Sequence, residues 1–422
     1  MDKQSYRKRL IDAQVELYLS TFGAVCVEGP KWCGKTWTSE MHAKSAFMIA
    51  DPADNFANRQ LAQLDVSKAL VGEVPHLIDE WQEVPEIWDA VRFSVDQSPM
   101  TGRFLLTGSS TPPGKGVVHS GTGRIASLKM HPMSLFELGA STGQVSLADI
   151  CAAKDIGVET AQSPLVEDLA SFVVRGGWPG AIGKSPRQAA LIPREYVENV
   201  IKVDIHKVDG ITRDQSKVRK CLRSLARNES TTATTATIRD DIEEIDDSSV
   251  GINTVTDYLD AFRRIFLTND IEPFSTFLRS PTRIKQSSKR HFCDPSIAAA
   301  LLGATEGKLL RDFRTFGFLF ESLVLRDLQI YAEALDARLF HYQDYGGREI
   351  DAIVEFGDGA WSAFEIKLNP AQADEAAGNL RKIAALFKNN PPASLAVVVG
   401  KSGMAYRRPD GVYVLPITML KP

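Results

Sequence analysis

Residues 23 to 36 read Gly-Ala-Val-Cys-Val-Glu-Gly-Pro-Lys-Trp-Cys-Gly-Lys-Thr. The first half, residues 24 to 28, has the short apolar composition of a buried parallel strand. The second half fits the phosphate-loop pattern Gly-x-x-x-x-Gly-Lys-Thr. Such a loop wraps phosphates with backbone N–H groups, and the helix after it points a positive N-terminus at them. We therefore predict a phosphate cradle made of Gly29, Pro30, Lys31, Trp32, Cys33, Gly34, Lys35 and Thr36.

A second stretch supplies the acids that a phosphate loop requires. Residues 76 to 80 read His-Leu-Ile-Asp-Glu, a short strand ending in two carboxylates. Lys35 would neutralise the β- and γ-phosphates, while Thr36 and Asp79 would hold Mg²⁺. Glu80 would activate the attacking water. The alternative is a strand that ends in a solvated acidic turn. Beside the phosphate loop we favour the catalytic interpretation, with ATP and Mg²⁺ as cofactors.

Two further polar residues are candidates for the same site. The apolar strand at residues 103 to 108 ends at Ser109, which we assign as the polar group beside the γ-phosphate, with Thr107 as second choice. Strand ends also finish in Ser or Thr simply because these residues form turns. Arg124 could stabilise charge on the transferring phosphate, within its own chain or from a neighbouring subunit. The alternative is a plain surface arginine.

Length and composition bound the rest of the chain. A chain of 422 residues predicts two to four domains. The net charge of −4 excludes a simple polycation, so any contact with nucleic acid must use a local patch. The five cysteines are scattered without a Cys-x-x-Cys pair, which indicates no disulfide framework and a reducing cytoplasm. No apolar run reaches membrane-spanning length, so we expect no membrane partner.

The pattern of elements predicts four regions. Alternating strands and helices through residue 139 indicate a parallel sheet with helices on both faces. Residues 140–205 are expected to be a polar insertion or linker followed by a helical lid that breaks at Gly176-Gly177-Trp178-Pro179. Residues 206–278 suggest a winged helix, with 253–263 as the recognition helix and a hairpin made of 265–267 and 271–274. Winged helices bind DNA or proteins, and both readings stay open.

The last region, residues 279–422, carries a second candidate site. A helix over 313–335 is followed by strands, and alternation places Glu365 and Lys367 on one strand face. Asp351 on a neighbouring strand, with Glu321 from the helix, could complete a divalent-metal site for phosphodiester hydrolysis. The basic stretch 279–291 could bring in a phosphate backbone, or be a solvated loop. The alternative for Glu365 and Lys367 is a structural ion pair.

Together these motifs resemble the prokaryotic AAA-type P-loop ATPases that carry a C-terminal domain of unknown function with a restriction-endonuclease-like core. The resemblance implies nucleotide binding through Lys35 and Thr36, Mg²⁺ coordination through Thr36 and Asp79, and a nucleotide or interface role for Arg124. Members usually have arginine where this chain has Lys31, and Trp32 and Cys33 are unusual in the loop. The matching residues are 29–36, 78–80 with Gln82 and Pro85, 105–110, 123–124, 176–179, 347–351 and 365–367.

Two functions follow as expectations. The first is an ATPase coupled to a C-terminal module that binds or acts on DNA. The second is an ATP-driven switch, without nuclease activity, whose C-terminal domains bind a protein partner. A metabolic kinase is a third and weaker reading, because the acid pair and the large C-terminal part suit a motor or switch. A homo-oligomer is expected only because arginines often act on a neighbour's nucleotide. Salt-dependent DNA binding would favour the first function.

Overall fold

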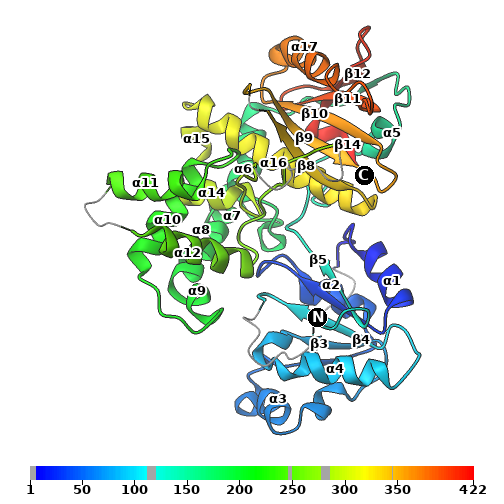
Figure 1. Ribbon diagram of the computed structural model, residues 1–422, viewed down its shortest axis with the longest axis vertical. Coiled ribbons are helices and arrows are strands. Elements are labelled where there is room, and N and C mark those ends of the chain that lie inside the picture. Colours follow the sequence, from blue (N-terminus) through cyan, green and yellow to red (C-terminus); the bar gives the residue numbers. More distant parts are fainter. Residues whose placement is uncertain (1–5, 112–119, 246–249, 277–285, 345) are drawn as a thin grey trace. The chain divides into compact units, whose positions relative to one another are not determined.

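The computed structural model describes residues 6–111, 120–245, 250–276, 286–344 and 346–422 (Figure 1). The chain divides into two compact parts. Unit 1 comprises the residues up to Pro132 together with Lys202–Arg213 and Asp260–Leu267. Unit 2 comprises Met133–Ile201, Asp214–Leu259 and Thr268–Pro422. In the described residues, no helix has the length and apolar character needed to cross a membrane.

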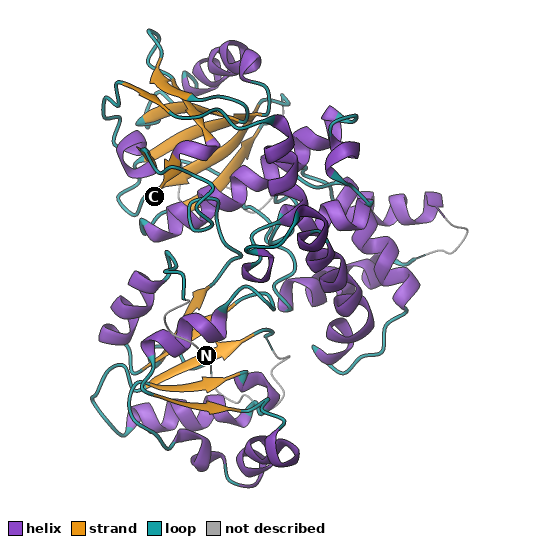
Figure 2. Ribbon diagram, turned by 180° about the vertical axis from the view of Figure 1, so that it is seen from behind, coloured by secondary structure: helices purple, strands orange, loops and turns teal. Residues whose placement is uncertain are grey.

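Unit 1 is built on a five-stranded sheet in the order β2-β3-β4-β1-β5, in which every neighbouring pair is parallel. This confirms the predicted α/β fold with a parallel sheet. Helices cover both faces of the sheet (Figure 2). The strands are β1 Ala24–Glu28, β2 Ser45–Met48, β3 His76–Asp79, β4 Phe104–Gly108 and β5 Ile125–Lys129. The helices are α1 Asp12–Thr21, α2 Lys35–His42, α3 Ala53–Leu64 and α4 Glu86–Asp96.

Alternation along the strands explains the two covered faces. In β1, Ala24 and Cys26 belong to a core cluster with residues of α3 and α4, including Val91. Their neighbours Val25 and Val27 belong to a separate cluster with Val15 of α1. Because successive side chains point to opposite faces, a continuous apolar run fills both cores. The central strands are therefore rigid supports for the residues at their carboxyl ends.

Unit 2 contains a helical region and a second sheet. Its sheet has the order β7-β12-β13-β11-β10-β9-β8, with parallel pairing only among β10, β11 and β13. The strands are β7 Val158–Thr160, β8 Arg338–Gln343, β9 Glu349–Glu355, β10 Trp361–Lys367, β11 Ser394–Val399, β12 Met404–Arg407 and β13 Tyr413–Pro416. The main helices are α6 Val166–Arg175, α8 Leu191–Asn199, α10 Gln215–Arg227, α11 Thr235–Ile245, α14 Pro295–Leu302, α16 Phe313–Ala334 and α17 Ala373–Ala384. Helix α12, Ile252–Arg264, begins in unit 2, and its residues from Asp260 on belong to unit 1.

The region expected to be an insertion or linker instead contributes strands to unit 2. Strand β7 pairs antiparallel with β12 and forms one edge of the seven-stranded sheet. Strand β6, Val145–Ser146, pairs in parallel with β14, Leu420–Lys421. These strands are two or three residues long, too short for an alternation pattern to be visible in the sequence.

The predicted hairpin of a winged helix is wrong, although its preceding helix forms as α12. Phe266 has a φ of 57° and the Leu267 N–H donates to the Phe262 carbonyl at 2.9 Å, so residues 265–267 cap the helix. The next residues pair elsewhere, since Ile271 bridges Lys289 and Pro273 bridges His341. An apolar run at a helix end was mistaken for a strand. The four-domain division itself stays a prediction.

Candidate functional site

The phosphate loop has the backbone that its glycines predict. Gly34 adopts φ 105°, a left-handed conformation that side chains rarely allow, and α2 begins at the next residue. At Gly29 the constraint is space, because an added Cβ would lie 2.2 Å from the Met130 carbonyl oxygen. The Gly29 N–H also donates to the Gly108 carbonyl at 3.2 Å. The loop is therefore held tightly between the ends of β4 and β5.

Lys35, Thr36 and Asp79 meet at the start of α2. The Lys35 ammonium donates to the Pro30 carbonyl at 2.9 Å, so the side chain folds back over the loop. The Thr36 hydroxyl donates to Asp79 Oδ1 at 2.8 Å, and the Thr107 hydroxyl donates to the same atom at 2.7 Å. Burial raises the pKa of Asp79, and these hydrogen bonds oppose that rise. A hydroxyl and a carboxylate side by side are hard oxygen ligands that suit Mg²⁺.

Glu80 and Ser109 are also brought together, as their predicted roles require. Ser109 Oγ donates to Glu80 Oε2 at 2.7 Å, and the Glu80 N–H donates to the Thr107 hydroxyl at 3.0 Å. Gln82 was not predicted as a site residue, yet its amide donates to both Glu80 and Ser109. Its position two residues after Glu80, on the 3₁₀ turn Trp81–Glu83, is the signal that could have revealed it. The three side chains form one hydrogen-bonded group beyond the ends of β3 and β4.

Arg124 is not part of this group. It precedes β5, and its carbonyl accepts from the Ala24 N–H at the first residue of β1, whereas the phosphate loop follows the last residue. Its guanidinium pairs with Asp96 at 2.7 Å and is about half exposed, at 48%. Arg124 therefore lies at the amino edge of the sheet, opposite the phosphate loop. A role toward a neighbouring copy stays a prediction.

Arg9 supports the loop from a segment that no motif marks. Its guanidinium donates to the Cys33 carbonyl at 2.8 Å and to the His131 carbonyl at 2.9 Å. It is buried, at 6% exposure. Tyr6, from the same segment, hydrogen-bonds Asp12 and shares a hydroxyl contact with Thr38 of α2. The residues before α1 thus fasten the phosphate loop to the segment after β5.

The Gly176-Gly177-Trp178 segment, predicted to be part of a lid, is packed inside unit 2. A Cβ on Gly177 would lie 2.1 Å from the Met133 carbonyl oxygen, and the Gly177 N–H donates to Asp294 at 2.9 Å. Trp178 is fully buried and its indole N–H donates to Ser296 at 2.9 Å. These contacts explain the two glycines and the tryptophan by close packing. The lid function itself stays a prediction.

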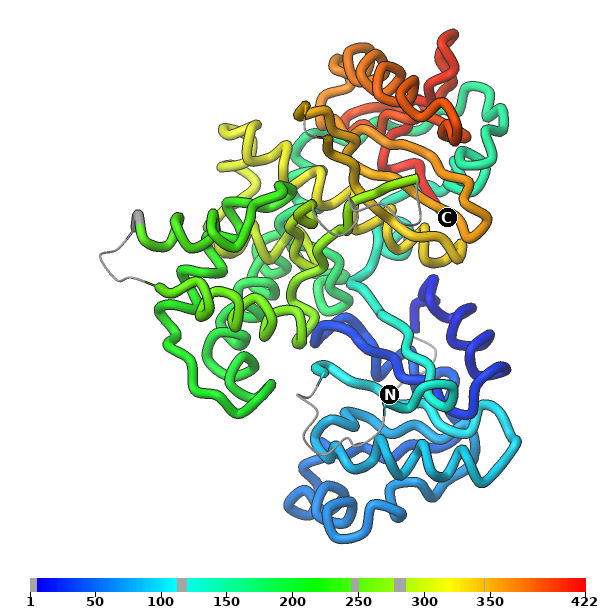
Figure 3. Tube along the Cα trace, in the orientation of Figure 1, coloured from blue at the N-terminus to red at the C-terminus, as the bar shows by residue number. Residues whose placement is uncertain are grey.

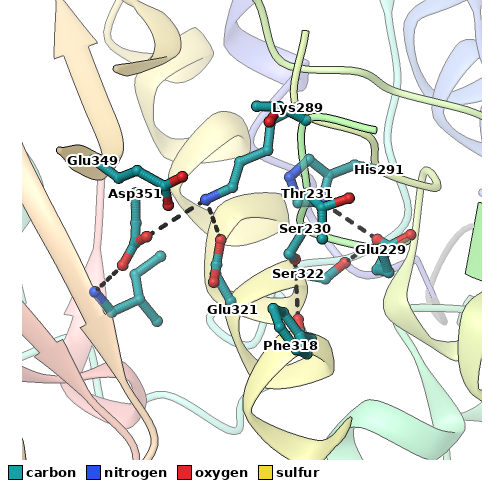
Figure 4. Close-up of polar contacts among 12 residues, drawn as sticks. Glu229, Ser230, Thr231, Lys289, His291, Phe318, Glu321, Ser322, Glu349 and Asp351 are labelled. Carbon is teal, nitrogen blue, oxygen red and sulfur yellow. Dashed lines mark hydrogen bonds and ion pairs between the residues drawn. The ribbon is translucent and has the colours of Figure 1, made fainter. Parts of the chain in front are cut away.

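The second candidate site gathers all four predicted residues in unit 2. Lys367 pairs with Glu365 at 2.8 Å and lies 3.9 Å from Asp351. Asp351 also accepts from the Ile366 N–H at 2.8 Å. Lys289, which was grouped only with a basic stretch, lies between the acids of this cluster. It pairs with Glu321 and is 3.4 Å from Asp351 (Figure 4).

Burial and pairing set the charges of this cluster, named here the acid–lysine cluster: Lys289, Glu321, Asp351, Glu365 and Lys367. Burial raises the pKa of Glu321 to about 8 and that of Glu365 to about 7. The neighbouring carboxylates raise the pKa of both lysines despite their burial. Within the described residues, no three or more His, Cys, Asp and Glu side chains are grouped to hold a metal ion. The expected metal role stays a prediction.

The structure describes only residues 286–291 of the basic stretch 279–291. Its residues 279–285, including Arg283 and Lys285, lie outside the described residues. Lys289 belongs to the acid–lysine cluster, and Arg290 pairs with Asp270 at 2.6 Å. Both are therefore engaged within unit 2.

Comparison with known proteins divides the chain into three matched regions. Residues 21–139 match a family model described as an AAA domain. Residues 166–308 and 316–420 match two models each described as a domain of unknown function. Uncharacterized proteins of Mycobacterium bovis and Mycobacterium tuberculosis are each 24% identical over 349 residues, covering 81% of this chain and 70% of the relative.

A solved structure was also compared with the chain. A Walker-type ATPase of Pyrococcus abyssi aligns with a TM-score of 0.44 and 11% identity, covering 71% of this chain and 97% of that one. The AAA match at 21–139 falls on the sheet and phosphate loop described above. The match to the AAA family model and the geometry of the sheet and phosphate loop together support an AAA-type P-loop ATPase domain in this part of the chain.

Proposed function

We propose that unit 1 binds ATP with Mg²⁺ and hydrolyses it. The observation that carries the proposal is the 2.8 Å hydrogen bond between Thr36 and Asp79 at the start of α2. It places a hydroxyl and a carboxylate together at the end of a loop whose backbone N–H groups suit phosphates. Lys35, folded over the same loop, is the cation that faces the β- and γ-phosphates. Thr36 and Asp79 would hold Mg²⁺, which when bound neutralises phosphate charge.

Glu80 is the proposed general base. Its carboxylate follows β3 directly after Asp79 and is held by Ser109 at 2.7 Å and by Gln82. These donors fix the orientation of one carboxylate oxygen. The other oxygen can accept a proton from a water molecule lined up on the γ-phosphate. Ser109, in turn, places its hydroxyl at the same edge of the sheet.

Glu80→Gln tests this role. The amide keeps the size of the side chain but cannot accept a proton, so ATP should bind with near wild-type affinity while turnover falls by about 100-fold or more. Measuring phosphate release and ATP affinity on the same preparation separates the two effects. Glu83→Gln, on the same turn, is the matched control and should keep wild-type turnover. Wild-type turnover in Glu80→Gln would remove Glu80 from the mechanism.

We further propose that ATP hydrolysis is coupled to a DNA-binding or DNA-acting function of residues 279–422. Support comes from the grouping of Asp351, Glu365 and Lys367 on neighbouring strands of unit 2. The alternative is a switch that binds a protein partner and cuts nothing. A strong decrease of DNA affinity with added salt would favour the first, because phosphate contacts release counterions. Salt-insensitive or absent DNA binding would favour the alternative.

The metal prediction for the acid–lysine cluster has its own test. If Asp351 and Glu365 hold a divalent ion, replacing both by Ala should lower the Mn²⁺ stoichiometry by about one per chain. The titration compares both proteins in the same Lys35→Ala background with the nucleotide omitted, so that any ion held by Thr36 and Asp79 contributes equally to both. ATP turnover of the double variant with Lys35 intact should equal that of wild type. Equal Mn²⁺ stoichiometry with and without the two acids would show that the cluster is structural.

A further inference from the structure

The phosphate loop forms an ion pair through a residue that has no part in the catalytic mechanism proposed above. Lys31 Nζ lies 2.7 Å from Asp204 Oδ1. Both residues belong to unit 1, although they are far apart in the sequence. Asp204 is largely buried at 12% side-chain exposure, while Lys31 is 43% exposed. A carboxylate is therefore held against a loop that is shaped to receive phosphates.

The segment carrying Asp204 is irregular and well anchored. Helix α8 continues into a π-helical stretch, Val200–Asp204, followed by the short helix α9, Ile205–Lys207 (Figure 3). Such π-helical turns are frequent at functional sites. After α9, the buried Arg213 donates to the Ile205 carbonyl at 2.7 Å and pairs with Asp209 at 2.6 Å. Asp204 is thus presented to the loop by a segment with its own internal bonds.

A second contact joins the end of α12 to the segment that follows β4. The Thr111 N–H, two residues after Ser109, donates to the Arg264 carbonyl at 2.9 Å. The Arg264 guanidinium lies 4.0 Å from Asp209. Residues 202–213 and 260–267 therefore meet the rest of unit 1 at the phosphate loop and just beyond β4. Both points lie at the carboxyl edge of the sheet, where Glu80 and Ser109 are found.

We infer that Asp204 is a positioning residue of the nucleotide site, which competes with the nucleotide phosphates for Lys31. This inference rests on the proposed ATP binding. A triphosphate bound in the loop would attract the Lys31 ammonium and repel the Asp204 carboxylate, so both effects oppose the ion pair. By thermodynamic reciprocity, the pair lowers ATP affinity as much as ATP weakens the pair. ATP binding thereby loosens the attachment of residues 202–213 to the loop.

Asp204→Asn tests whether the ion pair between Lys31 and Asp204 lowers ATP affinity. Removing the carboxylate should tighten binding of a non-hydrolysable ATP analogue with Mg²⁺ by about two- to fivefold, the range expected for a partly exposed ion pair. The gain should shrink at high salt, because added ions screen the removed repulsion. Glu195→Gln, an exposed acid on the preceding helix α8, is the control and should leave affinity unchanged. Unchanged or weaker binding by Asp204→Asn would overturn the inference.

Hydrogen exchange, measured first on the wild-type protein, tests whether ATP binding loosens residues 202–213. Adding the analogue should speed amide exchange in residues 202–213. In Asp204→Asn and in Lys31→Met, exchange there should already be fast, and the analogue should add little. Unchanged or slower exchange in nucleotide-bound wild type would reject the linkage. If the wild type does not bind the analogue at all, the proposed ATP function fails, whereas binding without these effects defeats only the role of Asp204.

Discussion

Lys289→Met is expected to lower the free energy of unfolding of unit 2 by about 3–5 kcal/mol, because it leaves buried carboxylates without their cation. Lys289 is 5% exposed, pairs with Glu321 and lies 3.4 Å from Asp351. Methionine is unbranched and only one atom shorter than lysine, so the loss reports on charge more than on packing. The measurement is the midpoint of urea unfolding. Lys382→Met, on the exposed side of α17, should change it little.

The pH dependence of the stability of Lys289→Met shows whether the loss of stability comes from charge or from packing. In the variant, Glu321 has lost its cation and can become neutral only by binding a proton, so its folded-state pKa should rise further above the unfolded one. The folded variant then holds more protons than the unfolded chain, and its stability falls as pH rises through that interval. Since the pKa of Glu321 in the wild type is already about 8, the deficit should stay level up to about pH 8 and grow above it. A deficit independent of pH would point to lost packing instead.

Lys35→Ala is expected to weaken ATP binding by about 10- to 100-fold, the range for a lost charge-assisted contact. The Lys35 ammonium is 5% exposed and already oriented over the loop by its bond to the Pro30 carbonyl. Its loss removes the fixed cation expected at the β- and γ-phosphates. Calorimetry with ATP and Mg²⁺ measures the change, and Lys44→Ala, exposed just after α2, is the matched control. Unchanged affinity in Lys35→Ala would overturn the assignment of the phosphate loop.

The grouping of Asp79, Thr107 and Ser109 could be predicted because these residues lie at the ends of parallel strands. Asp79 follows β3 and Ser109 follows β4, and the register that pairs Ile78 with Leu106 places Asp79 beside Thr107. Carboxyl ends of parallel strands meet at one edge, so separate apolar runs with polar ends indicate one site. Arg124 comes before β5 and therefore lies at the opposite edge of the sheet, while its role toward a neighbouring copy stays a prediction.

The residues that were missed depend on long-range contacts without a local pattern. Lys289 reaches Glu321 and Asp351 because its backbone pairs with Ile271, a contact that no periodicity reveals. Arg9 donates to two carbonyls, at Cys33 and His131, and a backbone acceptor leaves no trace in the sequence. The same holds for Asp204, whose partner Lys31 lies in another part of the chain. In each case tertiary packing, not local propensity, decides the neighbour.

The pairing of β6 with β14 and of β7 with β12 has a consequence for biosynthesis. The Ser141 hydroxyl donates to the Leu420 carbonyl at 2.6 Å, and strands β6 and β7 find their strand partners among residues 404–421. A ribosome making this chain must add more than two hundred residues between them, at about 5–20 residues per second. For that interval, of the order of ten seconds or longer, the nascent segment has no sheet to join. Unit 2 is therefore the part of the nascent protein for which we expect chaperone protection to matter most.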